Sequence, residues 1–239
     1  MRRKAFATFR TAIALVPFFL FTLAMAFVVT VLSLVRRDSP VIERIIRLWS
    51  RLFLSTAPVK LEVSGAEHVD PGGQYVFVAN HLSNFDIPVM FLAAPVPIRY
   101  LAKKELYKIP LVAQAMNGIG IIKTDRQAHA GGHALINQGV AEAKRRGHSL
   151  IIFPEGTRSD EGVLASFKKG AFRIAIANEL PVVPVTIDGT WQAWPPGSKV
   201  VYPGHARVVI HEPIPTKDLE LTQIGELRDR AYAAVASAL

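Results

Sequence analysis

An apolar segment near the N-terminus constrains the fold of this chain more than any other feature. Residues 11–35, TAIALVPFFLFTLAMAFVVTVLSLV, contain no charged side chain. As a helix, about 25 residues rise about 37 Å, whereas the hydrocarbon core of a bilayer is about 30 Å thick. The segment therefore predicts a membrane-embedded helix. It can either span the bilayer with some tilt or dip into one leaflet as part of a helical hairpin.

A secretory signal peptide is the competing interpretation of this segment. Basic residues precede the apolar run, and Ala24-Met25-Ala26 resembles a cleavage site. However, the apolar run continues well past Ala26 to Val35, which favours an anchor that is not cleaved. The basic residues in question are Arg2, Arg3, Lys4 and Arg10.

Residues 40–58, PVIERIIRLWSRLFLSTAP, follow with apolar side chains at helical spacing. Arg44, Arg47 and Arg51 fall on the other face, so the pattern predicts a basic amphipathic helix at a headgroup interface. A surface helix packed on the domain is the alternative. We predict a membrane anchor over residues 1–57 and a second domain over residues 58–239. Basic residues flank the apolar run on both sides, so charge alone does not set its orientation.

From residue 58 onward, short apolar runs of strand length alternate with helical patterns. This alternation predicts an α/β fold with a mixed, largely parallel sheet covered by helices. Pro184 interrupts one apolar run, which indicates an edge strand, a bulge or a bend. The expected strands are 59–65, 74–80, 98–106 (its beginning), 118–124, 149–156, 180–189 and 206–213; the expected helices are 86–94, 127–146, 169–179 and 217–238.

Charge and cysteine content exclude several classes of function. The formal net charge of +9 favours an anionic partner such as a membrane surface or an anionic substrate. The second domain lacks a basic helix interleaved with aromatic residues, so we expect no nucleic-acid partner. The chain has no cysteine, which rules out disulfides, zinc–thiolate sites and cysteine nucleophiles.

The stretch VANHLSNFDIPV, residues 78–89, places a histidine and a carboxylate where an apolar strand ends. A turn would bring Asp86 back toward His81. A carboxylate that accepts from Nδ1–H leaves Nε2 as an outward-facing base. Backbone N–H groups of residues 80–83 are candidate donors to an oxyanion. The alternative is a structural pair that caps a strand and a helix.

Basic residues follow other strand-like runs. IIFPEGTRS, residues 151–159, runs through a tight Pro-Glu-Gly turn to Arg158, and GIIKTDR, residues 120–126, ends in Arg126. Lys103 stands at the end of another run. Arginine binds phosphate or carboxylate bidentately, so several basic strand ends beside a histidine predict an anion-binding mouth.

Four stretches, in order, resemble the motifs of the glycerolipid acyltransferase family, and the closest branch is the 1-acyl-sn-glycerol-3-phosphate acyltransferases. They are NHLSNFD, GIIKTDR, FPEGTRS and VVPVT, and the resemblance covers about residues 58–215. It implies that His81 is the general base and that Asp86 orients it. It also implies that Arg126 and Arg158 bind the acceptor phosphate. The other candidate substrate-binding residues are Lys103, Glu155, Gly156 and Thr157.

The resemblance implies acyl transfer from a thioester of coenzyme A or acyl carrier protein to the sn-2 hydroxyl of lysophosphatidic acid. The product is phosphatidic acid, with no acyl-enzyme, no cofactor and no metal. Another lysolipid acceptor, or a non-catalytic lipid-binding protein with the same fold, stays open. The expected location is a bacterial inner membrane, with the catalytic domain on the cytoplasmic face, where the donor is found.

Overall fold

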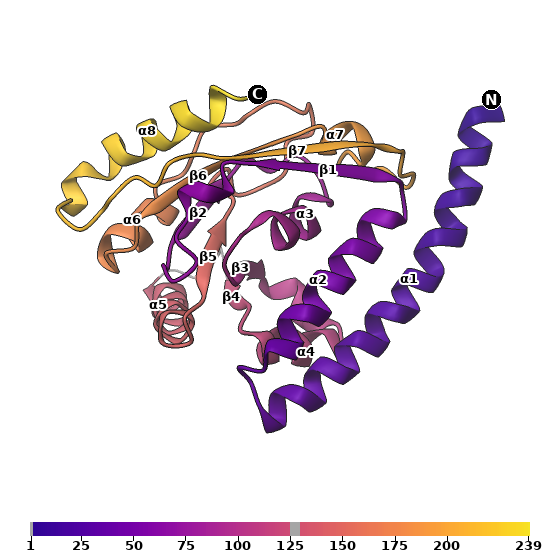
Figure 1. Cartoon of the computed structure of the whole chain (residues 1–239), viewed down its shortest axis with the longest axis horizontal. Helices are drawn as coiled ribbons and strands as arrows, with labels where there is room; N and C mark the ends of the chain where they lie inside the picture. Colours follow the sequence, from indigo (N-terminus) through magenta and orange to yellow (C-terminus); the bar gives the residue numbers. More distant parts are fainter. Residues whose placement is uncertain (1, 125–129) are drawn as a thin grey trace.

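The computed structural model describes residues 2–124 and 130–239, and in this part of the chain a single seven-stranded sheet forms the centre (Figure 1). The order of its strands is β1-β7-β6-β2-β5-β3-β4. Strands β6 and β7 pair antiparallel, and all other neighbours pair parallel. The strands are β1 (Val59–Ser64), β2 (Val76–Ala79), β3 (Ile98–Lys103), β4 (Ile122–Thr124), β5 (Ser149–Ile152), β6 (Val182–Asp188) and β7 (Gly204–Ile210).

Helices cover both faces of the sheet, as the continuous apolar strands require. One apolar core joins the sheet to α2 and α3, and the other joins it to α5, α6 and α8. The predicted fold class, a mixed and largely parallel α/β sheet with an N-terminal apolar helix, is therefore confirmed. The helices are α1 (Arg2–Val35), α2 (Pro40–Ser55), α3 (Asp86–Ala93), α4 (Val112–Ile119), α5 (Ala130–Arg145), α6 (Gly170–Ala177), α7 (Thr190–Ala193) and α8 (Ile224–Ala236), with the 3₁₀ turns η1 (Ala66–His68), η2 (Lys104–Lys108) and η3 (Leu221–Gln223).

The region between β3 and β4 differs from the prediction. The turn η2 and helix α4 stand where no helix was expected, and the predicted strand over 118–124 begins only at Ile122. Gly120 has a φ of 89° and ends α4 in the left-handed conformation that glycine adopts without strain. Apolar residues continue on both sides of Gly120, so the sequence pattern did not show where the helix ends and the strand begins.

Pro184 lies in β6, which is an interior strand, so the edge position among the three expected alternatives is wrong. The pairing register changes by one residue between the Val182–Ile214 bridge and the Val185–Ile210 pair. The segment after β7 that faces Pro184 therefore contains one extra residue between its paired positions 210 and 214, as in a bulge. A bulge tolerates the missing N–H of proline.

Helices α1 and α2 pack on each other and on the domain. Trp49 Nε1 donates to Thr22 Oγ1 at 3.1 Å, and the rings of Phe18 and Phe53 stack with centroids 4.6 Å apart. In α2, Ile42, Ile46 and Leu54 belong to the same core as the sheet. The two segments on either side of residue 57 thus share one core.

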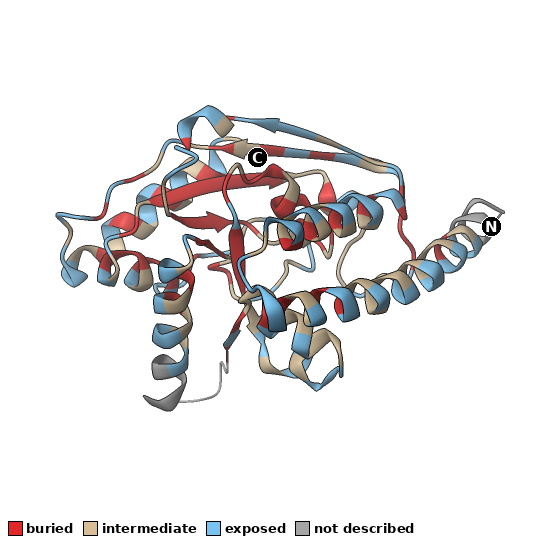
Figure 2. Cartoon of the chain, turned by 60° about the horizontal axis from the view of Figure 1, so that its bottom comes forward, coloured by how far each residue is buried: buried red, intermediate tan, exposed pale blue. Residues whose placement is uncertain are grey.

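The outer face of α1 is exposed and apolar along most of its length (Figure 2). Among the described residues, Thr8–Val35 is the one helical stretch that is long and apolar enough to cross a membrane. Arg44 and Arg51 are exposed, but Arg47 donates to the carbonyls of Leu92 and Ala94 at the end of α3. The predicted basic face of this helix is thus exposed at Arg44 and Arg51, whereas Arg47 is held against α3.

Candidate active site

The carboxyl ends of β2, β5 and β6 lie side by side, and most of the predicted site residues gather there. Asn80 follows β2 directly, and its side chain is fully buried. Its Nδ2 donates to the carbonyl of Ile187 in β6 at 2.7 Å, and its Oδ1 accepts from the N–H of Ile187 at 2.8 Å. This pair of bonds fixes the turn that carries His81 against the neighbouring strand.

His81 and Asp86 form the hydrogen bond that their spacing predicts. Nδ1 of His81 lies 2.8 Å from Oδ2 of Asp86. A carboxylate has no proton to donate, so Nδ1 carries the hydrogen and Nε2 keeps its lone pair. The side chain of His81 is 15% exposed, whereas that of Asp86 is fully buried. The imidazole is thus partly accessible to solvent, whereas the carboxylate that it contacts is not.

Asp86 accepts four hydrogen bonds, which offset the cost of burying its charge. Oδ2 also accepts from the N–H groups of Leu82 and Ser83 at 2.7 and 2.8 Å, and Oδ1 accepts from the hydroxyl of Thr190 at 2.6 Å. Thr190 was not among the predicted residues, although it follows the Asp-Gly turn at the end of β6.

The backbone around His81 is used within the protein. The N–H of His81 donates to Glu155 Oε1 at 2.6 Å, and the N–H groups of Leu82 and Ser83 donate to Asp86. The expectation that these three groups face an oxyanion is therefore wrong.

Glu155 lies just beyond the end of β5 and ties two loops together. Its Oε1 accepts from His81 and its Oε2 accepts from the N–H of Ala165 at 3.0 Å. Burial raises the pKa of Glu155, and the two backbone donors oppose that rise. Both oxygens are bonded within the protein, so Glu155 holds the His81 turn, and its role in substrate binding stays a prediction.

Phe153 is a second contact that the sequence analysis missed. Its ring stacks on the His81 imidazole with centroids 3.9 Å apart and planes 9° apart. Tyr100 lies next to Phe153, with ring centroids 5.8 Å apart, and its hydroxyl donates to the carbonyl of Ile87 at 2.9 Å. The imidazole is thus held by Asp86 through its edge and by Phe153 through its face.

The cationic residues of the prediction occupy several positions around this pair. A guanidinium nitrogen of Arg158 donates to Asn84 Oδ1, and the N–H of Ser159 donates to the carbonyl of His81 at 3.0 Å. Gly156 has a φ of 82°, and a Cβ added there would lie 2.7 Å from Lys168 Nζ. The structure therefore brings Arg158 next to the turn that carries His81, and it places Lys168, which was not among the predicted residues, beside Gly156.

The remaining predicted residues are more distant or not described. Thr157 is exposed, and Lys103 is exposed at the end of β3, two strands from β2 and about 10 Å away across the sheet. Arg126 lies outside the described residues. Among the described side chains, no three His, Asp or Glu residues converge as a metal site would.

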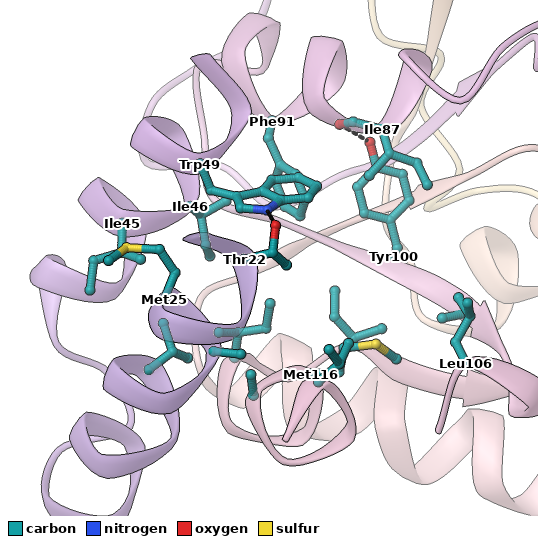
Figure 3. A pocket seen from close by; sticks show the side chains of 17 residues that line it. Thr22, Met25, Ile45, Ile46, Trp49, Ile87, Phe91, Tyr100, Leu106 and Met116 are labelled. Atoms are coloured by element: carbon teal, nitrogen blue, oxygen red, sulfur yellow. Dashed lines mark hydrogen bonds between the residues drawn. The ribbon is translucent and has the colours of Figure 1, made fainter. Parts of the chain in front are cut away.

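An apolar cavity of about 230 Å³ lies beside the site, between α1, α2, α3, β3 and α4 (Figure 3). Ile87 and Tyr100 form part of its wall, and Tyr100 connects it through Phe153 to His81. The other walls include Met25 of α1 and Met116 of α4. The cavity thus lies next to the His81–Asp86 pair and is lined by apolar side chains.

The sheet topology and the buried pair together define an α/β domain with a His–Asp site at the carboxyl ends of its parallel strands. The chain belongs to the Acyltransferase family, whose model matches residues 60–188. The resemblance that the four motifs indicated is thereby confirmed.

Several curated relatives are named as 1-acyl-sn-glycerol-3-phosphate acyltransferases. A chloroplast protein of Arabidopsis thaliana is 34% identical over 173 residues, which cover 71% of this chain and 48% of the relative. The alpha protein of Bos taurus is 28% identical over 172 residues, covering 72% and 60%. The matched parts of these relatives are thus between about half and about three fifths of their length.

A solved structure matches nearly the whole chain. The crystal structure of the 1-acyl-sn-glycerophosphate (LPA) acyltransferase PlsC from Thermotoga maritima superposes with a TM-score of 0.77 at 27% identity. The match covers 100% of this chain and 97% of that chain, so it includes the N-terminal helices as well as the sheet.

Proposed function

We propose that this protein transfers a fatty acyl group from an acyl thioester to the sn-2 hydroxyl of 1-acyl-sn-glycerol-3-phosphate. The products are phosphatidic acid and a free thiol. The observation that carries the proposal is the imidazole of His81, whose Nδ1 is bonded to Asp86 while Nε2 keeps its lone pair at a partly open position. The names of the curated relatives and of the Thermotoga maritima protein describe the same reaction, which supports the proposal.

His81 acts as the general base in this proposal. Nε2 takes the proton of the acceptor hydroxyl while that oxygen attacks the thioester carbonyl. The tetrahedral intermediate then breaks its C–S bond, and the leaving thiolate takes the proton from the imidazolium. Asp86 stabilises that imidazolium between the two steps.

The proposal is a direct transfer without an acyl-enzyme, because the serine hydroxyl nearest the base in sequence, that of Ser83, is not placed to act as a nucleophile. Ser83 Oγ donates to the carbonyl of Trp194 at 2.8 Å and accepts from the N–H of Phe85 at 3.1 Å. It is fully buried, so it has neither the access nor the bonding of a nucleophile. The chain has no cysteine that could take its place.

Arg158 is the cation that we assign to the acceptor phosphate. Its bonded partner is the neutral amide of Asn84, so its charge is available to an anion. Lys103, at the end of β3, and Arg126, which lies outside the described residues, are further candidates for the same phosphate. The apolar cavity takes an acyl chain, because an apolar chain gains free energy when it leaves water for such a space.

The packing of α1 favours a position within one leaflet. The N–H of Val201 donates to Thr11 Oγ1, and at the other end of the helix a methyl group added at Gly118 would collide with Ser33. These two contacts are about 33 Å apart along the helix, which exceeds the hydrocarbon thickness of about 30 Å. A spanning helix could not touch the same domain at both points.

The protein would therefore sit on one face of the membrane. The cytoplasmic face of a bacterial inner membrane is the location that we propose, because thioesters of coenzyme A and acyl carrier protein are cytosolic. Lipid acceptor and product can then enter and leave from the leaflet that holds α1.

The test is thiol release from acyl-CoA or acyl carrier protein by the detergent-purified full chain, with and without lysophosphatidic acid. Release that requires the acceptor, and that falls about 10²–10⁴-fold in His81→Ala, supports direct transfer. Release without acceptor would indicate a thioesterase. Release only with a different lysolipid would show that this lysolipid, and not lysophosphatidic acid, is the acceptor. The absence of release with every acceptor would favour a non-catalytic lipid-binding protein.

A further inference from the structure

The connection between β3 and α4 carries two large apolar side chains that face solvent. Leu106 is 45% exposed and Ile109 is 42% exposed. Lys103 and Lys108 are also exposed in the same short segment. We call residues 103–109 the rim. Neither the proposed chemistry nor the packing of the core accounts for the exposed apolar side chains of the rim.

The local backbone directs the two apolar side chains to the same side. Residues 104–108 form the 3₁₀ turn η2, and the N–H of Ile109 donates to the carbonyl of Leu106. Such a turn has three residues per turn, so positions 106 and 109 lie one above the other. Tyr107, between them, is held by the bond from its hydroxyl to the carbonyl of Ile121 at 2.8 Å. The rim is therefore a built ridge with a fixed outward face.

The rim is linked to the apolar helix α1 through α4 and through the apolar cavity. Its neighbour α4 packs along the C-terminal half of α1 (Figure 1), where Gly118 and Ser33 are in close contact. Leu106 also lines the apolar cavity together with Met25 and Val29 of α1 (Figure 3). A half-exposed side chain that also lines the cavity lies at the boundary between the cavity and the surroundings.

We propose that the rim is a second membrane contact, in which Leu106 and Ile109 enter the headgroup region of an anionic leaflet beside α1. Lys108 lies between them in sequence and can keep its ammonium group at the lipid phosphates while its alkyl stem lies against apolar surface. The occupant is lipid rather than protein because the rim borders the apolar cavity that α1 also lines, and α4, its neighbour, packs on α1. The proposal rests on the membrane association of α1 and does not depend on acyl transfer.

A second contact fixes the rotation of the domain about the axis of α1. One helix in a leaflet leaves that rotation free, whereas a helix and a ridge define a plane. With both in place, the cavity boundary at Leu106 faces the bilayer, so a lipid chain can reach it without crossing water.

The absence of cysteine makes a direct test possible, since each single-cysteine variant carries one label. The full chain with Leu106→Cys or Ile109→Cys is labelled with an environment-sensitive fluorophore. It is then bound to mixed phosphatidylcholine–phosphatidylglycerol vesicles, with a nitroxide on the lipid chains or with aqueous iodide as quencher. Phe19→Cys on the exposed face of α1 is the positive control; Val163→Cys and Leu221→Cys, at exposed apolar positions outside the rim, are the matched negative controls.

We expect nitroxide quenching at 106 and 109 to reach at least half of that at 19, with protection from iodide, and no such quenching at 163 or 221. Nitroxide quenching at 106 and 109 equal to that at 163 and 221 would overturn the proposal. Protection from iodide without nitroxide quenching would also overturn it, and would indicate a second copy of the chain on the rim. If position 19 is not quenched either, the membrane position of α1 fails and the proposal fails with it, while the acyl-transfer assay remains a separate test.

Discussion

Replacing Asp86 by asparagine separates the charge of the carboxylate from its geometry. The amide oxygen of Asp86→Asn can take the place of Oδ2 and accept from His81 Nδ1, Leu82 N–H and Ser83 N–H. The amide nitrogen then faces the hydroxyl of Thr190, which can accept as well as donate. The fold and the tautomer of His81 should therefore survive, and the negative charge alone is lost.

The loss in rate follows from the interaction of that charge with the imidazolium. Two unit charges about 4 Å apart interact by about 4 kcal/mol at an effective dielectric constant of 20. The partial exposure of His81 weakens this interaction, so we expect kcat/KM to fall by between about 10² and 10³. The assay is steady-state thiol release at saturating acyl donor, with circular dichroism as the check on folding.

Thr190→Val is the matched control, because it removes one hydrogen bond to Asp86 and leaves the charge in place. Its kcat/KM should fall by no more than about tenfold, although its stability should drop by about 1–3 kcal/mol. If Asp86→Asn keeps more than a tenth of the wild-type rate, the carboxylate does not stabilise an imidazolium and the general-base reasoning is refuted.

Three further predictions concern the turn, the acid stability and the cavity. Gly156→Ala should raise KM for the phosphorylated acceptor in the thiol-release assay, because its φ of 82° strains alanine, the new Cβ collides with Lys168, and the turn that leads to Arg158 must shift; an unchanged KM would contradict this. Burial, and then the charge of Arg99, lower the pKa of His148 from 6.5 to about 3, so the unfolded chain takes up the proton first and stability falls as the pH drops below 6.5. The fall should be about 2 kcal/mol by about pH 5, and His148→Gln should flatten this part of the thermal-unfolding profile. Met116→Trp fills the cavity and should shift the preference toward shorter acyl donors in a competition assay, whereas an unchanged preference would place the chain elsewhere.

The strands of this domain could be predicted because their sequence carries its own signal. Continuous apolar runs that end in polar turns placed His81, Glu155 and Arg158 at strand ends, and the spacing of five residues placed Asp86 within reach of His81. These are local relations, which a periodicity and a turn determine without knowledge of the rest of the chain.

The parts that could not be predicted depend on contacts between distant segments. Thr190 and Asp86 are 104 residues apart in the sequence, and no local pattern around either residue predicts their hydrogen bond. Phe153 reads as one more residue of an apolar strand, yet it lies against the catalytic candidate His81. The cavity has walls from six elements, α1, α2, α3, β3, η2 and α4, so no single stretch encodes it. Helix α4 was missed because its apolar residues merge into those of β4.

Because α1 forms one wall of the cavity, its role is not limited to attaching the protein to the membrane. Thr22, Met25, Ala26 and Val29 are part of a segment whose composition describes only an anchor, yet their side chains bound the space beside His81. A truncation that begins after residue 35 would remove this wall and open the cavity to water. Under the proposed function, it should also lose the preference for acyl donors of a particular chain length. If the cavity takes the acyl chain as proposed, grafting the helix of one relative onto another should carry the chain-length preference with it, and α1 would then set specificity as well as attach the protein to the membrane.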